Sequence, residues 1–309
     1  MLKSLSHLLT HSSGLGYDGF DPTLVEWAKA AGRTVDTNSY SLEGYTVPLV
    51  FEPGEGWVYG VSLDWVGHLV SVLTNTTFED YLYKHIFTPL GMSSTTFRLA
   101  QRPDLVKARA AIGLRATPTA PLTAGGSDPV PTEPEMAGGG SGLFSTAADY
   151  AKLLGALIAG GGGILQPETV REMCQPQLPD NKYLMMNFEN PYLHDVFCCE
   201  YSAGTPANYA LGGAVNLEDL PEKRRKGSIM WSGMSNPHWV SFDKGFPEVK
   251  RLIIRRSGWI SRVVLLRCYS HRCCHLVIPW SRICMMSWRK LSIRIYSIEC
   301  ETLVLRSFP

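Results

Sequence analysis

The stretch His7-Leu8-Leu9-Thr10-His11-Ser12-Ser13-Gly14-Leu15 is the most informative part of this sequence. Its apolar residues predict a short helix over residues 2–10, and Ser12-Ser13-Gly14 ends it. Further motifs follow in a fixed order, and together with the first they span roughly residues 2–245. They are Phe51-Glu52-Pro53-Gly54-Glu55 followed by Trp57-Val58-Tyr59-Gly60-Val61, Phe87-Thr88-Pro89-Leu90-Gly91-Met92, residues 137–147 (AGGGSGLFSTA) and residues 227–239 (GSIMWSGMSNPHW).

The segments between these motifs predict helices first and strands later. Apolar residues recur at helical spacing over residues 62–75, and Thr77 can cap a second helix that stops before Pro89. Residues 116–140 hold many Pro, Gly, Thr and Ala residues, which predicts a long loop or lid. Two more helices are expected, one from about 146 to 159 and one from Pro167, and residues 208–217 and 227–243 are expected as strands.

Composition limits the class of protein but indicates no particular binding partner. Hydrophobic residues make up 45% of the 309-residue chain, enough for a sizeable core, and the formal net charge is +1. No run of eighteen apolar residues occurs, so no transmembrane helix and no membrane partner are expected. The first seven residues do not form a signal peptide, and the cysteines show no evenly spaced framework, which favours a reduced, cytoplasmic location.

Several motifs that suggest ligands lack the residues that would complete them. His7 and His11 are four apart, but no acid or cysteine follows at metal-ligand spacing. The run 138–142 (GGGSG) resembles a phosphate cradle, but neither Lys-Ser/Thr nor Rossmann spacing follows it. We therefore expect no metal and no cofactor, and we interpret the glycine run as a tight turn beside a cleft. The absence of Gly-x-Ser-x-Gly argues against an α/β-hydrolase.

The motifs together resemble the serine β-lactamase-like family, which includes class C β-lactamases, D-alanyl-D-alanine carboxypeptidases and esterases. They are most similar to its fungal esterase and transesterase branch. The resemblance implies an α/β (α+β) fold, in which an antiparallel sheet is flanked by helices and a helical lobe covers about residues 20–160. It assigns residues 1–248 to a partial domain of this kind and places the active cleft between sheet and lobe.

In this family, acyl groups pass through an ester on a serine, and a tyrosine shuttles the proton. Tyr59 matches that tyrosine. An ordinary phenol has a pKa near 10 and is a poor base at neutral pH, so the tyrosine needs a neighbouring cation. The alternative is that Tyr59 is a buried strand aromatic.

The strand motif Trp231-Ser232-Gly233 stands where true β-lactamases have Lys-Thr/Ser-Gly. An apolar wall at Trp231 favours neutral esters or thioesters over penicillin-like substrates, unless Trp231 is only a core aromatic. The resemblance makes Met234 the expected backbone donor of an oxyanion hole and Gly139 and Gly140 the expected cleft turn. A small-molecule ester or thioester is thus the expected partner, and the oligomeric state stays open.

The Ser-x-x-Lys that supplies the nucleophile in this family should lie roughly fifty residues before the first motif. This sequence starts only six residues before it. Its two Ser-x-x-Lys matches, Ser241 to Lys244 and Ser287 to Lys290, come after the motif, in the wrong order. We therefore expect no nucleophile in this chain and a truncated, catalytically incomplete enzyme. The alternative is a non-enzymatic remnant or pseudogene product.

The charge is split along the chain. Residues 1–248 hold 26 acids and 17 Lys/Arg, whereas residues 249–309 hold 12 Lys/Arg and two acids. Residues 249–309 depart from the family pattern, and their bias toward Arg, Cys, Trp and Ser is typical of a shifted reading frame. We interpret them as an aberrant tail and not a native domain. The alternative is a genuine basic module, but no motif for binding nucleic acid supports it.

Overall fold

The computed structural model describes residues 5–110, 113–114, 121, 123–124, 130–190, 193–194, 201, 204–220, 225–232, 237–241, 250–256, 263–267 and 273–277. Ser232 and the strands after it are described as backbone. Residues 1–278 form one compact unit, and every described residue belongs to it.

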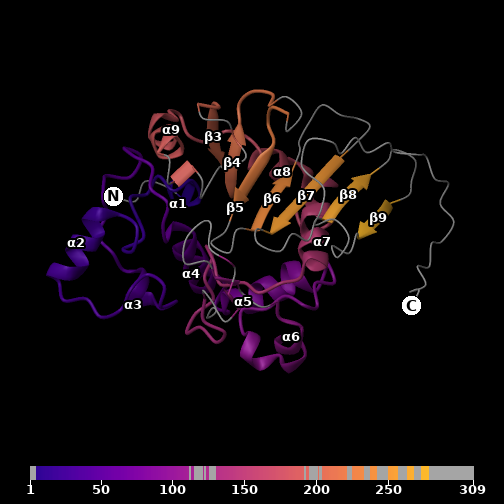
Figure 1. The fold of residues 1–309 in the computed structure, drawn as a ribbon, viewed down its shortest axis with the longest axis horizontal. Coiled ribbons are helices and arrows are strands. Elements are labelled where there is room, and N and C mark those ends of the chain that lie inside the picture. Colours follow the sequence, from indigo (N-terminus) through magenta and orange to yellow (C-terminus); the bar gives the residue numbers. More distant parts are fainter. Residues whose placement is uncertain are drawn as a thin grey trace. The chain divides into compact units, whose positions relative to one another are not determined.

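Helices occupy most of the first two thirds of the chain (Figure 1). They are α1 (Leu5–Leu9), α2 (Pro22–Ala30), α3 (Leu42–Tyr45), α4 (Ser62–Thr74), α5 (Phe78–Leu82), the π-helical η1 (Tyr83–Phe87), the 3-10 helix η2 (Leu99–Gln101), α6 (Pro103–Ala108), α7 (Ala147–Ile158), α8 (Pro167–Met173) and α9 (Lys182–Glu189).

Local sequence explains where several of these helices begin. The hydroxyl of Thr77 accepts a hydrogen bond from Asp80 N, and Thr146 caps α7 in the same way through Asp149 N. Asp21 caps α2, and Pro22 fills its first turn. The helices predicted at 62–75, 146–159 and 167 are confirmed. The helix predicted from Thr77 is confirmed in extent and ends at Phe87, before Pro89, but its second half from Tyr83 is the π-helical turn η1 instead of α-helix.

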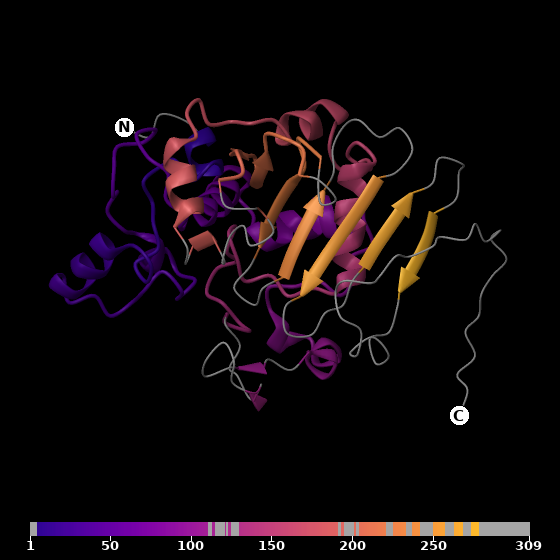
Figure 2. The same ribbon diagram turned by 45° about the horizontal axis from the view of Figure 1, so that its top comes forward.

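Strands form one seven-stranded antiparallel sheet in sequence order from β3 to β9 (Figure 2). They are β3 (Ala207–Ala210), β4 (Gly213–Asn216), β5 (Ile229–Ser232), β6 (Pro237–Ser241), β7 (Lys250–Arg256), β8 (Val263–Arg267) and β9 (Cys273–Val277). The single strand predicted over 208–217 was wrong, since Gly212 adopts a φ of 108° and turns the chain into the β3–β4 hairpin. The strand predicted over 227–243 is likewise the pair β5 and β6.

A two-stranded ladder joins β1 (Gly113–Leu114) to β2 (Thr123–Ala124), so the predicted loop over 116–140 contains one short strand. The last three strands of the large sheet fall after residue 249. The assignment of residues 249–309 to an aberrant tail stays a prediction, and residues 279–309 lie outside the described part of the chain.

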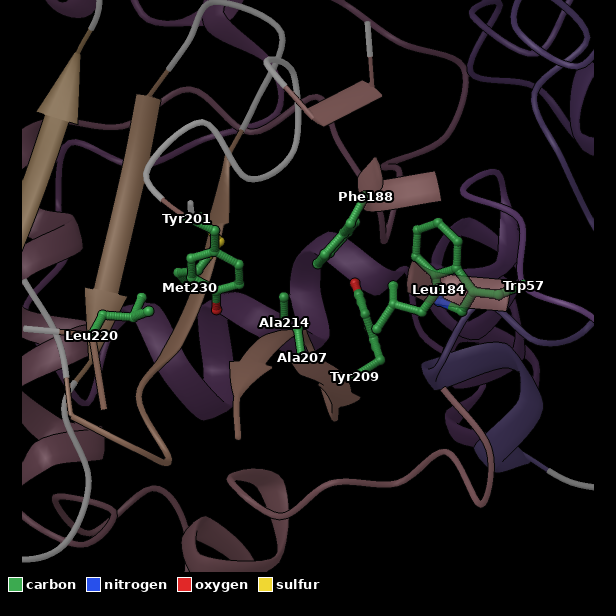
Figure 3. Close-up of a cluster of buried hydrophobic side chains, with 9 residues drawn as sticks. All are labelled: Trp57, Leu184, Phe188, Tyr201, Ala207, Tyr209, Ala214, Leu220 and Met230. Carbon is green, nitrogen blue, oxygen red and sulfur yellow. The ribbon is translucent and has the colours of Figure 1, made fainter. Parts of the chain in front are cut away.

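Helices and sheet pack together as the resemblance implied, so the expected fold class is confirmed. Helix α9 packs against β3, α7 packs against β7 and β8, and α1 packs against α4. The main core cluster lies between α9 and strands β3 to β5, and Trp57 reaches it from the segment before α4 (Figure 3). In the described residues, no helix is both long and apolar enough to cross a membrane.

Candidate active site

The first two sequence motifs lie side by side in the structure. Val58 N donates to His11 O at 3.0 Å, and Gly60 approaches so closely that a Cβ there would overlap the Leu15 carbonyl oxygen. The residue between them, Tyr59, is thereby fixed next to the loop of the first motif. This backbone contact is the physical reason why both motifs are needed to build one site.

Tyr59 lies among aromatic side chains that come from distant parts of the chain. Its ring centroid is 4.8 Å from His11, 5.4 Å from Tyr17 and 5.3 Å from Trp231. Tyr59 and Trp231 are half-buried and pack against the core cluster that contains Trp57. The structure thus brings together the two side chains that the sequence singled out, 172 positions apart (231 − 59).

The surroundings of Tyr59 favour the protonated phenol. Burial is the largest effect and raises the pKa of Tyr59 above its usual value of 10.0. Hydrogen bonds from the side chains of Trp231 and Tyr17 lower this pKa, while the negative charge of Asp64 raises it. At neutral pH the group is therefore a neutral phenol, which can donate a proton but cannot act as a base.

His11, which the sequence suggests only as half of an incomplete metal site, is a buried neighbour of Tyr59. It is 1% exposed, and its ring lies 6.1 Å from that of Trp57 and 5.5 Å from that of Tyr209. Burial lowers the pKa of His11 to about 3, so the imidazole is neutral at physiological pH. Within the described ranges, no group of three or more His, Cys, Asp or Glu side chains could hold a metal ion.

The glycine run of the fourth motif, residues 137–147, packs on the first turn of α4, just after Tyr59. Gly140 N donates to Asp64 Oδ1 at 3.0 Å, and a Cβ at Gly139 would overlap the carbonyl oxygen of Leu63. Asp64 is 1% exposed, and burial raises its pKa to about 7 although the bond from Gly140 lowers it. Asp64 was not among the residues predicted for the site. Its signal was an acid three residues after Val61 and one before Trp65, on the apolar face of a helix.

The predicted oxyanion residues are described only in part. Ser232 is the last residue of β5, where its backbone pairs with His238 of β6. Gly233 and Met234 lie outside the described residues, so their role stays a prediction, as does the cleft-turn role of Gly139 and Gly140. A surface hollow is lined by residues of α4, α5 and the segment 135–137, and neither Tyr59 nor Trp231 is among its lining residues.

The family model described as Beta-lactamase matches residues 4–241. The chain belongs to the beta-lactamase family. Within this family it is similar to monacolin J acid methylbutanoyltransferase of Aspergillus terreus, with 36% identity over 246 residues, 76% of this chain and 58% of the relative. It is also similar to lovastatin esterase of Penicillium rubens, with 34% identity over 240 residues, 76% of this chain and 60% of the relative.

Solved structures agree with this placement in the beta-lactamase family. A mutant of simvastatin synthase from Aspergillus terreus superposes with a TM-score of 0.69 at 36% identity, over 78% of this chain and 58% of that one. EstCE1, a hydrolase with promiscuous acyltransferase activity, shares the fold with a TM-score of 0.55 at 20% identity, over 76% of this chain and 62% of that one. This beta-lactamase family chain spans about three-fifths of the length of its two curated relatives.

Proposed function

We propose that this beta-lactamase family chain carries part of an active site for ester hydrolysis or transesterification through an acyl-serine, and that Tyr59 is its proton-transfer residue. The observation that carries the proposal is the packing of Tyr59 on Trp231, with ring centroids 5.3 Å apart and a hydrogen bond between the two side chains. The acyltransferases and esterases among the relatives support the same class of reaction.

The proposed substrate is an uncharged small-molecule ester or thioester. Trp231 presents an indole where a cationic side chain would select a substrate carboxylate, and an indole favours apolar groups. One relative is named for transfer of a methylbutanoyl group and another as an esterase for lovastatin. A small apolar acyl group is consistent with the first of these names.

The proposed chemistry needs more than Tyr59. A raised pKa keeps Tyr59 protonated, so it becomes a base only when a cation stabilises its phenolate. The lysine of a Ser-x-x-Lys would supply that cation, but no Ser-x-x-Lys precedes Tyr59 in these 309 residues. We therefore propose that the polypeptide made of these residues does not form an acyl-enzyme.

The test is to incubate the purified 309-residue protein with p-nitrophenyl acetate and with a fluorophosphonate probe. We expect no burst of p-nitrophenol and no stoichiometric labelling of a serine, with only a small rate above water from binding and polarisation. Tyr59→Phe and, as a matched control, exchange of the exposed Tyr183 to Phe should both leave this background unchanged. Stoichiometric labelling of one serine would show that the chain carries its own nucleophile.

A second candidate is a non-enzymatic remnant with no catalytic role, which would apply if the gene encodes no Ser-x-x-Lys before these 309 residues. The genomic sequence before the codon of Met1 separates the two. If an in-frame Ser-x-x-Lys lies there, the longer protein should show a burst, and Tyr59→Phe should slow it by about 10²-fold or more, as expected for loss of a proton-transfer group. If none lies there, the remnant is favoured.

A further inference from the structure

The glycine run 138–140 is shaped around the carboxylate of Asp64. A Cβ at Gly138 would lie 2.7 Å from Asp64 Oδ1, and one at Gly140 would lie 2.9 Å from Asp64 Oδ2. The amide of Gly140 donates to Oδ1 at 3.0 Å. Because Cβ atoms do not approach other atoms this closely, side chains at these positions would push the turn away. The run resembles an anion cradle in sequence, and the anion that it encloses is a side chain of the same protein.

Asp64 contacts the glycine turn and lies at the start of the helix that follows Tyr59. It lies in the first turn of α4, five positions after Tyr59, and its carboxylate also accepts a hydrogen bond from the side chain of Tyr45. The titratable groups whose pKa values its charge raises are four tyrosines from three segments of the chain, namely Tyr17, Tyr40, Tyr45 and Tyr59. The hydroxyl of Tyr40 also forms a hydrogen bond of 2.8 Å with Ser141 Oγ, which is a second contact to the glycine turn.

We propose that Asp64 is a positioning residue, whose buried carboxylate holds the glycine turn on α4 and places one negative charge at the start of the helix that follows Tyr59. This inference goes beyond the proposed function. It concerns the conformation of the turn and the proton affinity of Tyr59, so it holds or fails whether or not the chain turns over an ester.

The charge of Asp64 changes in the physiological range. Because burial raises its pKa to about 7, the carboxyl is largely neutral near pH 6 and largely ionised near pH 8. One oxygen can accept from Gly140 N in both states, but only the ionised state opposes loss of the Tyr59 proton. Proton release from Tyr59 should therefore be easier when Asp64 is neutral.

The first arm of the test measures the pKa of Tyr59. The protein is labelled with 3-fluorotyrosine and titrated by fluorine NMR, and the Tyr59 resonance is assigned through Tyr59→Phe. We expect Asp64→Asn, which keeps the shape and removes the charge, to lower the Tyr59 pKa, because the negative charge of Asp64 raises it. Asp149→Asn is the matched control, because it removes a buried carboxylate that also accepts a backbone N–H, from Ser94 at 2.7 Å.

The second arm follows the amide resonance of Gly140. In the wild type it should shift with a midpoint near pH 7, and Asp64→Asn should abolish that shift while keeping an acceptor for the amide. Asp64→Ala should displace the resonance at all pH values. If Asp64→Ala does not fold, the titrations of wild type and Asp64→Asn still test whether Asp64 has the proposed role. An equal Tyr59 pKa in wild type and Asp64→Asn, or a Gly140 amide insensitive to pH near 7, would overturn the proposal.

Discussion

Acidification should destabilise this fold through one buried histidine, His11. Its imidazole is neutral in the folded protein because burial lowers its pKa from 6.5 to about 3. The unfolded chain binds the proton more readily, so the stability that depends on neutral His11 is complete above pH 6.5 and is lost as the pH falls toward 3. Neither ring nitrogen has a hydrogen-bond partner among the described residues, so nothing compensates the charge.

The size of the effect follows from the two pKa values. With 6.5 in the unfolded and about 3 in the folded state, the loss is about 2 kcal/mol at pH 5 and about 3 kcal/mol at pH 4. A typical domain has only about 5–15 kcal/mol of stability, so the change is large enough to measure.

His11→Phe removes the titrating group and keeps a flat ring against Trp57 and Tyr209. At pH 8 two effects oppose each other. Loss of two unpaired buried nitrogens stabilises, while the larger ring and the φ of 57°, which suits His better than Phe, destabilise. The decisive quantity is therefore how the difference in unfolding free energy between His11→Phe and wild type changes with pH, and not its value at one pH.

The assay is guanidinium unfolding followed by tryptophan fluorescence at half-unit steps from pH 8 to pH 4. The free energy of unfolding of His11→Phe, relative to wild type, should rise by about 3 kcal/mol over this range. His85→Phe changes an exposed histidine of η1 and should leave the wild-type slope intact. Parallel curves for wild type and His11→Phe would refute the reasoning, because His11 would then titrate alike in both states.

Three further outcomes are expected. In the same unfolding assay, Asp64→Asn should stabilise the fold relative to wild type by about 4 kcal/mol more at pH 8 than at pH 4. The reason is that the wild-type protein loses folding stability as the pH rises from 3.8 through 7, since the folded state holds the proton of Asp64 more tightly than the unfolded state does. Gly139→Ala should lower the melting temperature, because the methyl group would meet the backbone at Leu63, whereas Gly155→Ala in the open middle of α7 should stabilise by about 0.5–1 kcal/mol. Thr146→Ala should reduce the free energy of unfolding in denaturant by about 1 kcal/mol, since α7 loses its capping bond to Asp149 N.

Local chemistry made much of the helical part predictable. The caps at Thr77 and Thr146 and the proline at 167 act within one turn of the helix, so the sequence alone identifies them. Helix α2 carries the same kind of signal in Asp21-Pro22 but was not predicted as a separate helix. The hairpin at Gly212 was not predicted, because two short strands and one longer strand share the same apolar content.

The candidate site shows the same difference between what the sequence predicts and what only the structure shows. Its motifs identify Tyr59 and Trp231 by residue type and order, and they indicate the beta-lactamase family, because the chemistry of an acyl-serine demands those residue types. Residue type and order do not fix how strongly each of these groups is desolvated. Whether Tyr59 is a phenol or a phenolate, whether His11 is charged, and which anion the glycine run encloses are set by desolvation and by groups distant in sequence. Those properties exist only once the first motif, the start of α4, the glycine turn and strand β5 meet, so only the tertiary structure decided them.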